Sequence, residues 1–171
     1  GYGDYIMKPD LSTLRLVPWL EGTALCLCDV LDHHSHAPVP FAPREVLKRQ
    51  VARAEAIGLT PIMATELEFF LFQGTHDEIA AGGFRDLRPI SHYNEDYHIF
   101  QTSKEEPVMR PIRNHLRAMG VPVEGTKGEA EAGQEELNIK YAEALACADH
   151  HTLAKNAVKE IHLVRPILDP C

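Results

Sequence analysis

Two glutamates, Glu66 and Glu68, are separated by a single residue inside an apolar and aromatic stretch, residues 65–72. The length and composition of this stretch predict a buried strand. Because side chains alternate along a strand, the two glutamates should share one face about 7 Å apart, with Leu67 and Phe69 on the other. They are either solvated acids at a strand end or ligands of a hard cation such as Mg²⁺ or Mn²⁺, which prefers carboxylate oxygens.

A cation site needs more carboxylates, and residues 128–141 supply them. From residue 135 onward the pattern alternates, which places Glu136 on a polar strand face and Glu135 on the opposite one. Gly133 allows a tight turn that could carry Glu129 back over the face of Glu136. A run of acids alone is usually a solvated loop, but the two segments together are more specific than either.

Together these segments resemble the catalytic domain of the glutamine synthetases. The resemblance runs from about residue 3 to residue 160. It is carried, in chain order, by Asp10, Thr13-Leu14-Arg15, Pro18-Trp19, Cys28-Asp29, Pro43-Arg44, Glu66-Leu67-Glu68-Phe69, Val123-Glu124, Glu129, Gly133-Gln134, Glu136, Ala148-Asp149, Lys155 and Lys159-Glu160.

The resemblance implies a site with two divalent cations, Mg²⁺ or Mn²⁺, and ATP as co-substrate. By position, Glu68, Glu129 and Glu136 are the expected ligands of the first metal, and Glu66 is one ligand of the second. Glu129 also resembles the catalytic glutamate that helps to form the ammonium site, and Glu124 matches a nucleotide-binding position. The implied reaction phosphorylates the γ-carboxylate of glutamate with ATP, after which ammonia displaces phosphate.

Two alternatives stay open: a γ-glutamyl ligase acting on a polyamine or other amine, and a non-catalytic structural or binding member of the family. The resemblance also implies a homo-oligomer with sites between subunits. Family segments that carry the second metal's remaining His and Glu ligands are absent from this sequence. We therefore expect residues 1–161 to be the N-terminal portion of a catalytic domain, inactive alone, and residues 162–171 to be an unmatched tail.

Composition limits the other possibilities. A chain of 171 residues with 44% hydrophobic content can bury one core. A net charge of −8 argues against nucleic acid or an anionic membrane surface as partner. The sequence has no apolar run of membrane-spanning length and no signal-peptide pattern, and its four cysteines do not form a disulfide framework. We expect a cytoplasmic protein.

Several elements must position these acids. The patterns predict a buried strand over 23–30, a helix over 43–57 and a long irregular excursion over 73–104. A second helix should end at Gly120, and a third should run from 143 to 161. The expected fold is α+β: a curved, largely antiparallel sheet with glutamates on one face and helices packed on the other.

Overall fold

The computed structural model describes residues 3–164. The segment 165–171, which belongs to the expected unmatched tail, lies outside the described residues. The elements are β1 (Tyr5–Pro9), η1 (Leu11–Thr13), β2 (Arg15–Leu16), β3 (Ala24–Leu25), β4 (Cys28–Asp32), α1 (Pro43–Glu55), β5 (Ile62–Phe70), α2 (His76–Ala81), α3 (Ile99–Thr102), η2 (Ser103–Glu105), α4 (Glu106–Ala118), β6 (Val123–Gly128), β7 (Gln134–Glu143) and α5 (Ala144–Val164).

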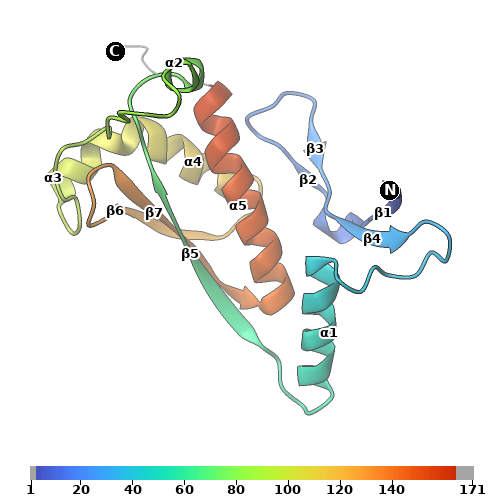
Figure 1. Cartoon of the computed structure of the whole chain (residues 1–171). Helices are drawn as coiled ribbons and strands as arrows, with labels where there is room; N and C mark the ends of the chain where they lie inside the picture. Colours follow the sequence, from blue (N-terminus) through green and yellow to red (C-terminus); the bar gives the residue numbers. More distant parts are fainter. Residues whose placement is uncertain (1–2, 165–171) are drawn as a thin grey trace.

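The main sheet has the strand order β5-β7-β6, and both pairs are antiparallel. Helix α5 lies against β5 and β7 on one face, while α4 packs against β6 and α5 (Figure 1). The opposite face carries Glu66 and Glu68 of β5 and Glu136 of β7. The α+β class and the antiparallel sheet are therefore confirmed, and these three glutamates lie on the face opposite the helices.

Strand β5 differs from the prediction in its position. It was expected to be buried, but it forms one edge of the sheet, and Met63 and Phe70 are about half exposed. Within residues 3–164, only β7 pairs with β5. The aromatic composition of a strand does not reveal how many neighbours the strand has, and this is why the sequence pattern failed here.

The hydrophobic core fills the space between the sheet and the helices α4 and α5. The alternation read in β7 places Leu137 and Ile139 in it, and both are fully buried. They pack with Ile112, Leu116 and Met119 of the α4 segment and with Leu153, Ala154, Ala157 and Ile161 of α5. No helix within the described part of the chain is long and apolar enough to cross a membrane.

The predicted helices are present with small boundary shifts, but the loops hold more structure than expected. The excursion over 73–104 contains α2, α3 and η2, and α2 begins with a capping box between Thr75 and Glu78. The strand expected over 23–30 is split into β3, which pairs with β2, and β4, which pairs with β1. Both pairs are antiparallel, so the N-terminal part of the described chain forms two small ribbons beside the main sheet (Figure 1).

Candidate active site

Strand register aligns charged side chains across the open face of the sheet. Glu68 of β5 is paired with Glu136 of β7, which is paired on its other side with Lys127 of β6. Glu66 lies two residues along β5, opposite Asn138. Because directly paired residues point to the same face, these side chains form one row across three strands, here called the carboxylate row.

Glu129 joins this row from beyond the end of β6. The Lys127 ammonium lies 2.6 Å from a carboxylate oxygen of Glu129 and 3.6 Å from one of Glu136. The same ammonium lies 2.7 Å from Asp96, which comes from the loop before α3. A single cation therefore bridges three carboxylates. All four glutamates expected as metal ligands, Glu66, Glu68, Glu129 and Glu136, lie on one side of the sheet.

The hairpin between β6 and β7 explains why Glu129 turns back. Gly133 has φ +73°, and a Cβ at this position would lie 2.9 Å from the Leu71 carbonyl oxygen, so glycine is required. The Glu129 amide donates to the Gln134 carbonyl at 2.8 Å. The Glu129 carbonyl accepts from the Glu95 amide at 3.1 Å. Main-chain bonds on both sides thus fix the position of Glu129.

The two carboxyls that touch Lys127 differ in their affinity for a proton. Hydrogen bonds from Lys127 and from the carboxyl of Glu136 lower the pKa of Glu129. Burial, the hydrogen bond to Glu129 and the nearby charges of Glu129 and Glu66 raise the pKa of Glu136. Of the two carboxyls, Glu129 therefore gives up its proton more readily than Glu136.

The donor chemistry of the row suits a hard cation, although its present geometry does not gather three ligands. Within residues 3–164, no three His, Cys, Asp or Glu side chains are close enough together to hold a metal ion. The carboxylates of the row have other partners instead. Gln134 donates to Glu68 at 2.6 Å, and Lys127 lies between Glu129 and Glu136. The carboxylate oxygens fit Mg²⁺ or Mn²⁺ chemically, and the row already binds a cation in the form of the Lys127 ammonium.

Glu124, the expected nucleotide contact, is not brought to the row. It is the unpaired residue of a bulge in β6, between Val123, which pairs with Ile139, and Gly125, which pairs with Asn138. Its side chain is exposed. At about 3.3 Å per residue, it lies roughly 10 Å along the strand from Lys127.

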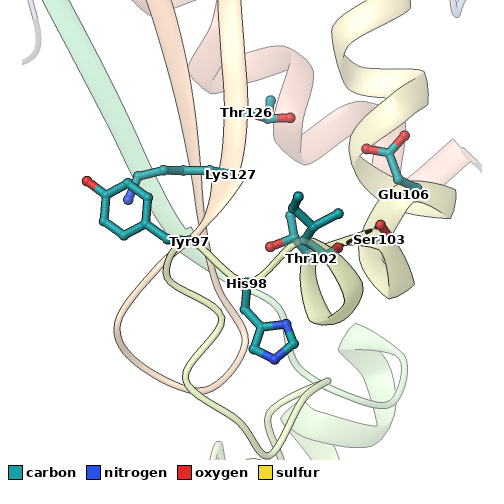
Figure 2. A pocket seen from close by; sticks show the side chains of 8 residues that line it. Tyr97, His98, Thr102, Ser103, Glu106, Thr126 and Lys127 are labelled. Carbon is teal, nitrogen blue, oxygen red and sulfur yellow. Dashed lines mark hydrogen bonds between the residues drawn. The ribbon is translucent and has the colours of Figure 1, made fainter.

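A cavity of about 390 Å³ opens beside the row, between β6 and the segment that contains α3. Figure 2 shows Lys127 and Tyr97 together on one side of it and Glu106 on the other. Tyr97 has φ +55°, which is unusual for a bulky residue, and its ring centroid lies 4.7 Å from the Lys127 ammonium. The cavity is lined by Tyr97, His98, Ile99, Thr102, Ser103, Glu106, Thr126 and Lys127.

A second group of acids lies behind the sheet. Glu135 is on the face opposite Glu136, as its parity predicts, between Phe69 and Gly128 in the register. It is fully buried, as is Glu95, and Glu105 is 4% exposed. Among the described residues, the carboxylate oxygens of Glu135 and Glu95 have no hydrogen-bond partner. The sequence indicated the face of Glu135 but not its burial.

This burial has an electrostatic consequence. Desolvation, reinforced by the charges of Glu95 and Glu105, raises the pKa of Glu135 to about 8. Burial and the charge of Glu95 also raise the pKa of Glu105. The close packing depends on Gly128, because a Cβ there would lie 2.5 Å from the Cβ of Glu95. Glu135 is therefore protonated at neutral pH.

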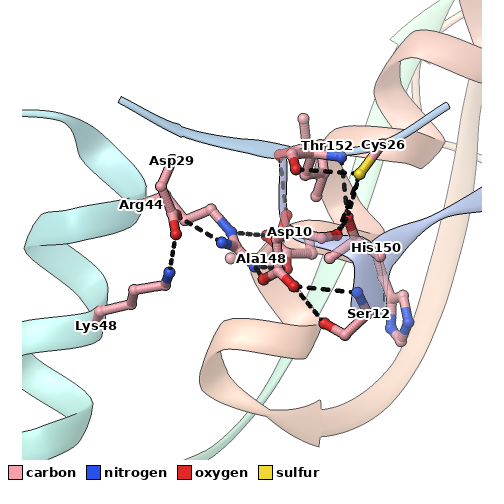
Figure 3. Close-up of polar contacts among 12 residues, drawn as sticks. Asp10, Ser12, Cys26, Asp29, Arg44, Lys48, Ala148, His150 and Thr152 are labelled. Atoms are coloured by element: carbon pink, nitrogen blue, oxygen red, sulfur yellow. Dashed lines mark hydrogen bonds and ion pairs between the residues drawn. The ribbon is translucent and has the colours of Figure 1, made fainter. Parts of the chain in front are cut away.

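A third charged cluster ties the N-terminal ribbons to the helices. Arg44 of α1 donates to Asp10 and Asp29 at 2.7 Å (Figure 3). It also donates to Asp149 of α5 at 2.9 Å. Lys48 also contacts Asp29. Hydrogen bonds from Ser12 and Arg44 lower the pKa of Asp10 to about 2. This cluster joins elements far apart in the sequence and lies apart from the carboxylate row.

Sequence reasoning missed Lys127, Asp96 and Glu95 as parts of the site. Lys127 stands two residues before Glu129, so its spacing would place it near the row if β6 were recognised as a strand. The glycines at 125 and 128 remove the alternation that would reveal this strand. Asp96 and Glu95 belong to a loop whose path no local pattern specifies.

Comparison with known proteins gives a consistent result. The family model described as glutamine synthetase, catalytic domain, matches residues 40–164. The gamma-glutamylethanolamide synthetase of Streptomyces coelicolor is 42% identical over 94% of this chain and 35% of its own length. The glutamate–isopropylamine ligase of a Pseudomonas species is 38% identical over 94% and 35%. The glutamine synthetase of Thermus thermophilus is 34% identical over 94% and 36%. The chain thus spans about a third of the length of these relatives.

Solved structures agree on the fold. A complex of GmaS with ADP superposes with a TM-score of 0.78 at 28% identity, covering 93% of this chain and 35% of that one. A crystal structure of a glutamine synthase homologue gives a TM-score of 0.73 at 20% identity, covering 96% and 36%, and this likeness concerns the fold alone.

Proposed function

This chain belongs to the glutamine synthetase family, since the catalytic-domain model matches most of its length. We therefore propose that it forms part of an ATP-dependent glutamate–ammonia ligase. The carboxylate row carries the proposal. A structural sheet face has no need to hold Glu129 and the buried Glu136 around the Lys127 ammonium, with Glu68 paired beside Glu136, because each carboxylate that loses its water lowers stability.

The proposed roles follow from position. Glu68, Glu129 and Glu136 hold a first divalent cation, and Glu66 contributes to a second, whose other ligands lie outside this sequence. Glu124 contacts the nucleotide. When bound, the two cations neutralise negative charge on the transferring phosphoryl group.

The residues of the chain have their own tasks in this reaction. The γ-carboxylate of glutamate attacks the terminal phosphorus of ATP and releases ADP, and the amine nitrogen then displaces phosphate from the acyl carbon. The ionised Glu129, whose pKa is lowered beside Lys127, attracts an ammonium ion and accepts a proton from it, which leaves ammonia with the lone pair that attacks the acyl carbon. The main-chain bonds that fix Glu129 keep this carboxylate in place.

A second candidate is a γ-glutamyl ligase for a larger amine. The names of the two relatives at 42% and 38% identity, an ethanolamide synthetase and an isopropylamine ligase, favour it. The two candidates share the carboxylate row and differ in the amine, so the metal experiment below tests them together. We also propose that the chain is cytoplasmic, which its free thiols at Cys26, Cys28 and Cys147 support.

Mn²⁺ titration tests the proposal. We expect the chain to bind about one Mn²⁺, because only the first site has its expected ligand set, and to melt at a higher temperature with the metal bound. Glu136→Ala should abolish most of that rise. Glu131→Ala is the matched control, because Glu131 is an exposed acid in the neighbouring turn. Equal losses from both variants would indicate diffuse charge attraction and would overturn the proposed site.

A further inference from the structure

Lys127 lies between Glu129 and Glu136, two expected ligands of the proposed metal site. The role inferred for Lys127 rests on that proposed function. We propose that the Lys127 ammonium is a built-in competitor of the divalent cation, bridging Glu129 and Glu136 until metal binding displaces it toward Asp96 and Tyr97. Lys127 would then set the cation concentration at which the site fills.

The contacts of Lys127 support competition. Its ammonium contacts Glu129 at 2.6 Å and Glu136 at 3.6 Å, and both are expected ligands of one cation. A carboxylate oxygen that accepts a short bond from an ammonium has less capacity for a metal, and two cations at the same oxygens repel each other. Lys127 therefore has to release these glutamates before both can serve as ligands.

The structure also provides a second resting place for the ammonium. Asp96, which is not an expected ligand, binds it at 2.7 Å, and the face of Tyr97 lies 4.7 Å away, a distance that suits a cation–π contact. The Lys127 side chain is 33% exposed, and it borders the cavity of about 390 Å³. The ammonium can therefore turn away from the glutamates while Asp96 and Tyr97 retain it.

The alternative is that Lys127 supports the site by holding its carboxylates together. The two roles predict opposite effects of removing the charge. If Lys127 competes, Lys127→Met raises the affinity for Mn²⁺ while it destabilises the metal-free chain, which loses a partner for three carboxylates. If Lys127 only supports the site, both quantities fall.

The experiment is calorimetric Mn²⁺ titration and metal-free thermal melting of the full chain and its variants. We expect Lys127→Met to bind Mn²⁺ at least tenfold more tightly and to melt at a lower temperature. Lys140→Met is the matched control, because Lys140 is exposed on the same face of the sheet, four residues and about 13 Å along β7 from Glu136. It should change neither quantity noticeably.

A double-mutant cycle separates displacement from a general charge effect. Asp96→Asn removes the second resting place, so it should weaken Mn²⁺ binding several-fold in the native background and have a much smaller effect beside Lys127→Met. Equal effects of Asp96→Asn in both backgrounds would overturn the inference.

The outcomes also separate this inference from the proposed function. If the native chain binds Mn²⁺ through Glu136 and Lys127→Met binds it equally or more weakly, the inference is wrong and the metal site stands. If only Lys127→Met binds Mn²⁺, the inference is supported in its strongest form. If neither protein binds Mn²⁺, the metal site itself fails, and the inference fails with it.

Discussion

Replacing Glu135 with Gln should remove a pH dependence from the stability of the fold. Burial raises the pKa of Glu135 from its usual 4.5 to about 8 in the folded chain. Between these two values, the folded state keeps a proton that the unfolded chain releases. The stabilising contribution of the protonated carboxyl is therefore complete below pH 4.5 and is lost as the pH rises toward 8.

The size of the effect follows from the shift. Each pH unit within the window changes the free energy of unfolding by up to about 1.4 kcal/mol. From pH 5.5 to pH 8 the native chain should lose about 3 kcal/mol through Glu135 alone. Gln has the shape of the protonated acid and carries no charge, so Glu135→Gln should not show this loss.

Urea unfolding without metal, followed by circular dichroism at pH 5.5 and pH 8, measures the effect. The stability of Glu135→Gln minus that of the native chain should increase by about 3 kcal/mol between the two pH values. Other titrating groups are common to both proteins and largely cancel. Glu131→Gln, at an exposed position in the same hairpin, should stay within about 0.5 kcal/mol of native at both pH values. A Glu135→Gln difference that does not change with pH would refute the reasoning.

Three further predictions concern the scaffold. Arg44→Met should destabilise the chain by about 2–4 kcal/mol, because it leaves three partly buried carboxylates without their shared cation; an unchanged urea midpoint would contradict this. Gly128→Ala should lower stability by about 1–3 kcal/mol in the same assay, since the new methyl group would collide with Glu95, whereas Gly125→Ala, with nothing within 4 Å of the new Cβ, is its control. The chain should self-associate in sedimentation, because no strand of the described residues pairs with the outer edge of β5, where Ile62 and Met63 are exposed; Met63→Lys should reduce this association, and a strictly monomeric native chain would disprove it.

Much of the fold could be predicted from local patterns. Three helices were predicted because helix periodicity and capping glycines are local signals. The alternation in β7 assigned Leu137 and Ile139 to the core and Glu136 to the opposite face for the same reason. The positions of β5 at an edge, of two short ribbons near the N-terminus and of α2 and α3 in the loop were not predicted, because they depend on contacts between distant segments.

The candidate site also has features that a local pattern predicts and features that depend on contacts between distant segments. The sequence by itself determined which face of each strand carries Glu66, Glu68, Glu135 and Glu136, because side-chain alternation is a property of a single strand. The tertiary structure alone decided that Glu68, Glu136 and Lys127 share one register level. It also decided that Asp96 reaches the same ammonium and that Glu135 is sealed from water. Register, loop path and burial come from pairing and packing between segments far apart in the chain, and no local pattern encodes those distances.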